Sequence, residues 1–209
     1  MVFMPSRQTA PVEQQSDDSA ISLGAQAIID LLDVVGVVHD VEHLQSVAFL
    51  AQEFGLLTAP TFLFASRGSE PRRPHSLLLE SHFYALLCEK VIDRDGSGRL
   101  CPRRDLYDLP HSGTVARRLG ILAGLTPRDT AVFAAAVLRL INDGRHAGSQ
   151  KHDAAFDDAV VLTASMCEDK HETAVDTAAI HAARQRLMPA TPVLLTTASA
   201  SRQLSAVSS

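Results

Sequence analysis

The sequence predicts an all-α protein, a compact single-domain helical bundle of residues 20–187 between two disordered tails, residues 1–19 and 188–209. Three observations support this fold class. Apolar residues recur at steps of three and four along the central region, which is the period of a helix with one buried face. No stretch alternates apolar and polar residues for long enough to indicate a sheet beyond incidental pairing. The tails are rich in polar and small residues, a composition typical of disordered chain ends.

The first two predicted helices are separated by a glycine. The first covers residues 21–35 and ends at Gly36, with Ile28, Leu31, Leu32 and Val35 on one stripe. Asp40 is a good N-cap for the second helix, because its side chain can accept a hydrogen bond from a free backbone N–H of the first turn. Gly55 ends that helix.

The middle of the chain holds one more helix between two connections. Residues 58–74 contain three prolines and are predicted as a long connection. The third helix covers residues 75–92. Residues 93–98, with the sequence DRDGSG, are predicted as a polar turn. The core-facing residues of the third helix are Leu79, Phe83, Leu86 and Leu87.

Four further helices complete the predicted bundle, at residues 110–124, 126–142, 153–168 and 172–187. The start of the second of these has the strongest signal: Thr126 caps, Pro127 takes the first position, and Asp129 lies three residues after the cap. Asp153 is predicted to cap the following helix. The predicted core face of the helix after Thr126 consists of Val132, Phe133, Ala136, Val137, Leu140 and Ile141.

Composition and charge narrow the range of partners. The net charge is −5 and the arginine pairs, such as Arg72–Arg73, are scattered without aromatic residues between them, which argues against nucleic acid as the main partner. The longest apolar stretch, residues 56–65, is too short to cross a bilayer, and residues 1–10 lack the apolar run of a signal peptide. Three cysteines without a CxxC pair indicate free thiols and a reducing compartment. Together with the short apolar stretches, they lead us to expect a cytoplasmic protein that does not bind membranes.

The most informative string is HDVEHLQSVA at residues 39–48. It resembles the first metal-site helix of the HD-domain superfamily of metal-dependent phosphohydrolases, in which a ligand histidine, here His43, is followed by Val-Ala. Further segments continue the resemblance in the family's order from residue 38 to about 170, and they imply a helical bundle of the HD-domain type. These segments are the apolar run Leu77–Leu79, the pair Pro110–His111, the turn at 124–127 and the segment 160–165.

The resemblance also implies a metal site, because two histidines and two aspartates of the family hold a divalent ion that polarises a phosphoryl oxygen and activates water. Here His43 is present, but Glu80-Ser81 or Ser81-His82 stands in place of the His-Asp dyad, and Ser165 stands in place of the last aspartate. Three of the four expected ligands are missing. We therefore expect a pseudoenzyme with no cofactor, which acts by binding a small phosphorylated molecule or a protein partner.

Two alternatives remain open at this point. In the first, His43, His111 and either Glu80 or His82 form a substitute site for Mn, Fe, Co, Ni or Mg in an active phosphohydrolase. Glu80 and His82 are two residues apart, so they cannot both face this site from one regular helix. In the second, the chain is a helical protein-interaction module that shares only the architecture of the family.

Two shorter motifs have simpler interpretations. His39 precedes the predicted cap at Asp40, so the literal His-Asp string lies outside the helix and His39 is predicted to be exposed. Residues 93–98 match the first half of an EF-hand loop, but Arg104 stands where a calcium-binding glutamate should be. A polar turn is the prediction there, and calcium binding is left open.

Overall fold

The computed structural model of the chain describes most of the residues between 15 and 188. Residues 15–22, 150–152 and 168 are described for the backbone only. The described segments are 15–36, 38–57, 62–69, 71–103, 119–144, 150–168 and 174–188.

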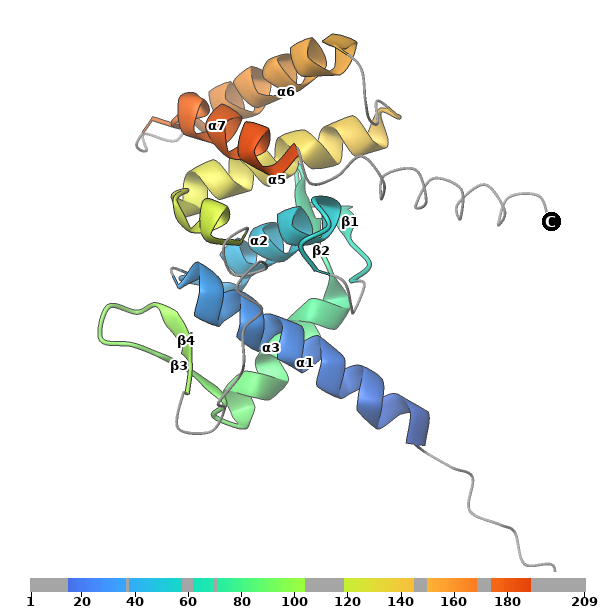
Figure 1. The fold of residues 1–209 in the computed structure, drawn as a ribbon, viewed down its shortest axis with the longest axis vertical. Coiled ribbons are helices and arrows are strands. Elements are labelled where there is room, and N and C mark those ends of the chain that lie inside the picture. Colours follow the sequence, from blue (N-terminus) through green and yellow to red (C-terminus); the bar gives the residue numbers. More distant parts are fainter. Residues whose placement is uncertain are drawn as a thin grey trace, which may run out of the picture.

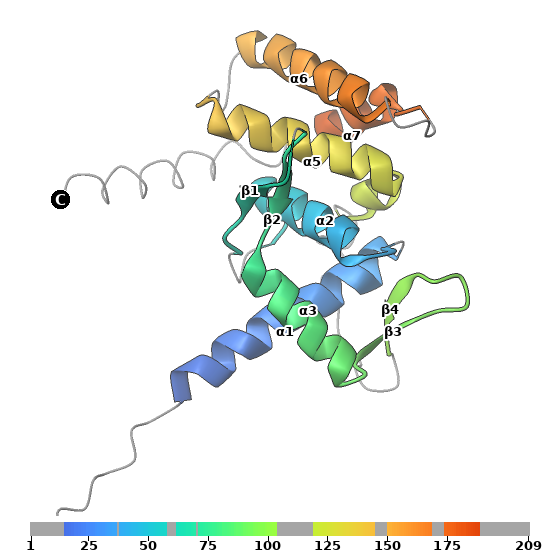
Figure 2. The same cartoon turned by 180° about the vertical axis from the view of Figure 1, so that it is seen from behind.

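The described part of the chain is mostly helical, as predicted, and its helices are stacked in layers (Figures 1 and 2). α1 and α3 cross at one end of the stack, and α2 lies between them and α5. α6 and α7 pack on α5 at the other end. The helices are α1 (Gln15–Val35), α2 (Val41–Glu53), α3 (Leu77–Cys88), α5 (Pro127–Asn142), α6 (Gln150–Glu168) and α7 (Thr177–Leu187).

Two short antiparallel hairpins accompany the helices. β1 (Ala65–Arg67) pairs with β2 (Arg73–His75), and β3 (Ile92–Arg94) pairs with β4 (Leu100–Pro102). β1 lies in the predicted connection, and β4 follows the predicted polar turn. β2 includes His75 and β3 includes Ile92, so the third helix is shorter at both ends than the predicted residues 75–92. Strands of three residues are too short for an alternating pattern to be recognised in the sequence.

The predicted caps of α2 and α5 are confirmed. The Asp40 carboxylate accepts a hydrogen bond from the backbone N–H of His43 at 2.7 Å. The Thr126 hydroxyl accepts one from the N–H of Asp129 at 3.1 Å and donates to the Asp129 carboxylate at 2.7 Å. Gly36, which follows α1, has a φ of 67°, so the left-handed geometry that ends this helix suits a residue without a Cβ.

Three predicted helix starts are wrong. α1 begins at Gln15, inside the predicted tail, because the acidic and polar residues that suggest disorder are also favourable in a first helical turn. α6 begins at Gln150, so Asp153 lies in its first turn and is not the cap. α7 begins at Thr177 instead of residue 172, with Asp176 as its cap, accepting from Ala179 N at 2.9 Å.

The predicted fourth helix, residues 110–124, lies mostly outside the described residues, and so does His111. Residues 119–123 are helical and Gly124 follows them in a turn, in agreement with the predicted end of that helix.

The core is a single cluster of buried apolar side chains that joins all the layers. Phe133 of α5 lies at its centre, with its ring centroid 5.7 Å from that of Phe54 and 5.8 Å from that of Phe156. Burying a side chain of this size contributes roughly 1.5–3 kcal/mol to stability. The predicted core faces agree with this cluster, except that Leu87, Val137, Leu140 and Ile141 are half-buried.

Two glutamines of α2 attach the β1–β2 hairpin to the bundle. The buried Gln45 amide donates to the carbonyl of Ser76 and accepts from its N–H, both at 2.9 Å. Gln52 makes the same pair of bonds to Phe62, at 3.0 and 2.8 Å. Since Phe62 precedes β1 and Ser76 follows β2, both ends of the hairpin are fixed to one helix.

No helix among the described residues is long and apolar enough to cross a membrane. Cys88, Cys101 and Cys167 are free thiols, as predicted.

Candidate functional site

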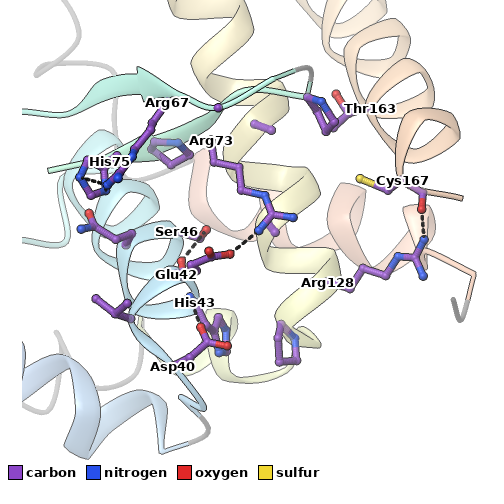
Figure 3. Close-up of a pocket in the computed structure, with 18 of the residues that line it drawn as sticks. Asp40, Glu42, His43, Ser46, Arg67, Arg73, His75, Arg128, Thr163 and Cys167 are labelled. Carbon is purple, nitrogen blue, oxygen red and sulfur yellow. Dashed lines mark hydrogen bonds and ion pairs between the residues drawn. The ribbon is translucent and has the colours of Figure 1, made fainter. Parts of the chain in front are cut away.

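A cleft of about 940 Å³, which we call the α2–α5 cleft, lies between the helices and the β1–β2 hairpin (Figure 3). Its walls are the first turns of α2 and α5, the β1–β2 hairpin, and parts of α3 and α6. The hairpin side carries Arg67, Arg73 and His75, and the opposite side carries Arg128 and Cys167.

His43 lies in the wall of this cleft, in the first turn of α2, with only 4% of its surface exposed. Neither ring nitrogen has a hydrogen-bond partner among the described residues. Burial lowers the pKa of His43 to about 4, while Asp40 acts to raise it and His39 to lower it. The imidazole is therefore neutral at neutral pH and offers one N–H and one lone pair.

His39 was predicted to be exposed, but it is half-buried. Its ring is nearly parallel to that of His43, with 6.4 Å between the ring centroids. His39 precedes the helix, as predicted. It is half-buried because the loop that contains it packs against the rest of the protein. The bridge between Val38 and Leu100 fixes this loop to β4, with a backbone hydrogen bond of 2.7 Å.

An ion pair crosses the α2–α5 cleft from β2 to α2. The Arg73 guanidinium donates to the Glu42 carboxylate, and both side chains are at least half exposed (Figure 3). Arg73 is thus solvated, as predicted for the arginine pairs, but it also lines the cleft.

A second charged group lies at the α3 end of the cleft. Nη1 of Arg67 lies 2.7 Å from Nε2 of His75, and the same ring nitrogen lies 3.2 Å from the Glu80 carboxylate. Arg67 is also 3.8 Å from that carboxylate. The Glu80 carboxylate therefore lies beside two side chains of the hairpin, Arg67 and His75.

The α5 side of the cleft is held by Arg128, whose guanidinium donates to the carbonyl of Cys167 at 2.6 Å. This bond joins the start of α5 to the end of α6. It keeps an arginine and a cysteine at one rim of the cleft (Figure 3).

The structure separates the residues that the sequence suggested as metal ligands. His43 and Glu80 line the same cleft, whereas His82 does not line it and packs against Gly24 of α1. Burial lowers the pKa of His82. His111 lies outside the described residues. Among the residues that the structure describes, no three His, Cys, Asp or Glu side chains are grouped to hold a metal ion. The substitute metal site therefore stays a prediction.

Ser165 is the position where the family resemblance placed the last aspartate. It is exposed on α6 and its hydroxyl donates to the carbonyl of Val161 at 2.9 Å. Thr163, two residues earlier, lines the cleft instead.

The turn that matches half of an EF-hand has its own hydrogen bonds. Asp95 accepts from the N–H and hydroxyl of Ser97, at 2.8 and 2.6 Å, and from the N–H of Arg99 at 3.0 Å. These bonds, led by the one from the Ser97 hydroxyl, lower the pKa of Asp95 to about 2. The Asp95 carboxylate thus holds the turn between β3 and β4 together. The Asp and Gly residues of this segment are therefore explained by the turn.

Comparison of the chain with protein-family models, with curated proteins and with solved structures finds no match. The geometry of the α2–α5 cleft is therefore the basis for the function proposed below.

Proposed function

We propose that the protein binds a small phosphorylated molecule in the α2–α5 cleft, and that it is a relative of the HD-domain phosphohydrolases with a lost or altered metal site. One observation carries this proposal. His43, the retained histidine of the resemblance, lies in a cleft that also receives Arg67, Arg73 and Arg128 from three different elements. Guanidinium groups are well suited to phosphate oxygens, because they can donate two parallel hydrogen bonds to them.

The surroundings of the expected ligands favour binding over metal catalysis. Glu80 is engaged with Arg67 and His75, and His82 faces α1. Of the described residues at the ligand positions that the family resemblance implies, His43 alone would then be placed to bind a divalent ion in the cleft. Such an ion needs several protein ligands, usually including carboxylates, to be held in a hydrolase site.

A thermal-shift panel tests ligand binding. It pairs phosphorylated compounds with their unphosphorylated counterparts, such as AMP with adenosine and glucose 6-phosphate with glucose. A ligand at 100 times its Kd stabilises the folded state by about 2.7 kcal/mol, which raises the Tm of a chain of this size by roughly 5 °C or more. We expect such a shift for at least one phosphorylated compound and none for its counterpart. A panel without any shift would refute the proposal.

The active-enzyme alternative needs a separate test. The purified protein is assayed for phosphatase and phosphodiesterase activity with added Mn²⁺, Fe²⁺, Co²⁺, Ni²⁺ or Mg²⁺, and its metal content is measured. We expect no turnover and far less than one equivalent of metal. Turnover that disappears in the His43→Ala variant would establish the substitute site instead.

A second candidate function is protein interaction, favoured by the outer face of α3. Leu77, Leu78 and Tyr84 of this helix are 74%, 49% and 50% exposed, and Tyr84 also lines the edge of the α2–α5 cleft. Exposed apolar side chains grouped in this way are common at interaction sites. Sedimentation velocity over a range of protein concentrations, with Leu78→Ser for comparison, tests self-association through this face. We propose the cytoplasm as the compartment, in agreement with the three free cysteines.

A further inference from the structure

The bridge between Arg73 and Glu42 has the features of a contact that a ligand can replace. It joins β2 to the first turn of α2 and lies in the α2–α5 cleft. The Arg73 guanidinium there already binds an anionic group, the Glu42 carboxylate. The two side chains are 50% and 70% exposed. Exposed ion pairs of this kind contribute little to stability, so little is lost when another anion takes the place of the carboxylate.

His43 follows Glu42 in the sequence and lines the same cleft. It is almost fully buried, and both of its ring nitrogens lack a partner among the described residues. An unpaired buried donor or acceptor is unfavourable, and His43 has one of each in its neutral form. A fully ionised phosphate can only accept from the N–H. A hydroxyl or amide group can both donate and accept, so it satisfies either nitrogen.

Building on the proposed function, we propose that the anionic group of the ligand displaces Glu42 from Arg73, and that a hydroxyl or amide next to it hydrogen-bonds to His43. Glu42 is then an internal substitute for the ligand's anion. An anion in the place of the Glu42 carboxylate lies against the first turn of α2, which also carries His43. The ligand class is a hydroxyl-bearing phosphate monoester, because its phosphate pairs with Arg73 while its hydroxyl, as donor or acceptor, pairs with whichever nitrogen of His43 it reaches.

Isothermal titration calorimetry with two probes tests this assignment. Methyl phosphate carries no alcohol hydroxyl group, whereas sn-glycerol 3-phosphate carries two. For the unaltered protein we expect about tenfold tighter binding of glycerol 3-phosphate, the worth of one hydrogen bond to a buried group. Arg73→Gln should weaken both probes by about tenfold or more, since it removes a charge-assisted pair. The matched control is Arg72→Gln, because Arg72 is adjacent in the sequence but does not line this cleft.

Glu42→Gln gives the sharpest result, because the residue is exposed and the variant should fold normally. We expect about threefold tighter binding of both probes, the size of an exposed ion pair. Glu89→Gln controls for the change in net charge, since Glu89 is exposed and outside the cleft. His43→Phe should remove the preference for glycerol 3-phosphate, whereas His43→Gln, which keeps a donor and an acceptor, should retain part of it.

The outcomes separate this inference from the function on which it rests. If neither probe nor any phosphorylated compound of the panel binds, the proposed function is wrong as well. If phosphates bind but Glu42→Gln acts no more strongly than Glu89→Gln, the displacement of Glu42 is refuted while the function stands. If His43→Phe weakens both probes equally, the assignment of His43 to the hydroxyl is wrong.

Discussion

Gly24 of α1 is the position at which a single added methyl group gives the clearest test of the packing. A Cβ on Gly24 would lie 2.4 Å from Nε2 and 2.5 Å from Cδ2 of His82 on α3. His82 is only 5% exposed, so its ring has no free space to enter. The Gly24→Ala substitution therefore forces α1 and α3 apart or moves the imidazole.

The magnitude follows from two opposing effects. Overpacking a buried contact costs about 1–3 kcal/mol. Replacing glycine by alanine inside a helix gains up to about 1 kcal/mol. We expect Gly24→Ala to lower the free energy of unfolding by roughly 1 kcal/mol. In a His82→Ala background the clash is absent, so the same substitution should instead raise it by up to about 1 kcal/mol.

Urea unfolding followed by circular dichroism at the helical band measures these values, because the chain has no tryptophan and only two tyrosines. Gly120→Ala is the matched control: Gly120 is helical and exposed, and beyond its own helix no atom of the described residues lies within 4 Å of its added Cβ. It should be neutral or slightly stabilising. An effect of Gly24→Ala with the same sign and size in both backgrounds would refute the contact between Gly24 and His82.

Three further predictions concern buried polar groups. Because the pKa of His43 is about 4 when folded and 6.5 when unfolded, its contribution to stability is complete above pH 6.5 and decreases by up to about 3 kcal/mol toward pH 4. His43→Phe should reduce this loss in urea unfolding at pH 7, 5.5 and 4, and an unchanged loss would contradict the prediction. Asp129→Ala should cost about 2–4 kcal/mol, because it removes the acceptor of Asp176 N, whereas Asp129→Asn should cost less. Gln45→Leu should cost about 1–3 kcal/mol, because it leaves the buried N–H of Ser76 without its acceptor while the Ser76 carbonyl keeps the bond from Glu80 N, and a near-neutral result in the same assay would show that the hairpin is not held there.

The elements that could be predicted from the sequence are those specified by neighbouring residues. The cap at Thr126 depends on a hydroxyl, a proline and an acid within four positions; the hydroxyl and the proline act as expected, and the Asp129 carboxylate accepts from the Thr126 hydroxyl. The starts of α1 and α7 could not be located in this way. Polar residues near Gln15 suit a helix as well as a tail, and the start of α7 is fixed by Asp129, 47 residues away, whose carboxylate accepts from Asp176 N.

The β1–β2 hairpin shows why the cleft could not be predicted. A glutamine in a helix suggests a solvated face, and the buried, paired role of Gln45 depends on where the chain returns 31 residues later. The same separation joins Glu42 to Arg73. In the sequence, Arg73 is one member of one of several scattered arginine pairs. Only the position of the hairpin in the fold shows that its guanidinium forms part of a wall of the cleft.

The two histidines that the structure describes as buried show how similar burial leads to different roles. His82 and His43 both have pKa values lowered by burial, so both are neutral at neutral pH. The ring of His82 is closely packed against Gly24, which is the environment of a core residue. His43 lies instead in the wall of a cleft, and the residue before it, Glu42, forms an exposed ion pair in the same cleft. A core imidazole gains its stability from packing, whereas an imidazole with two unpaired nitrogens at a cleft gains most when a ligand completes its hydrogen bonds. For this reason the functional hypothesis rests on His43 and not on His82.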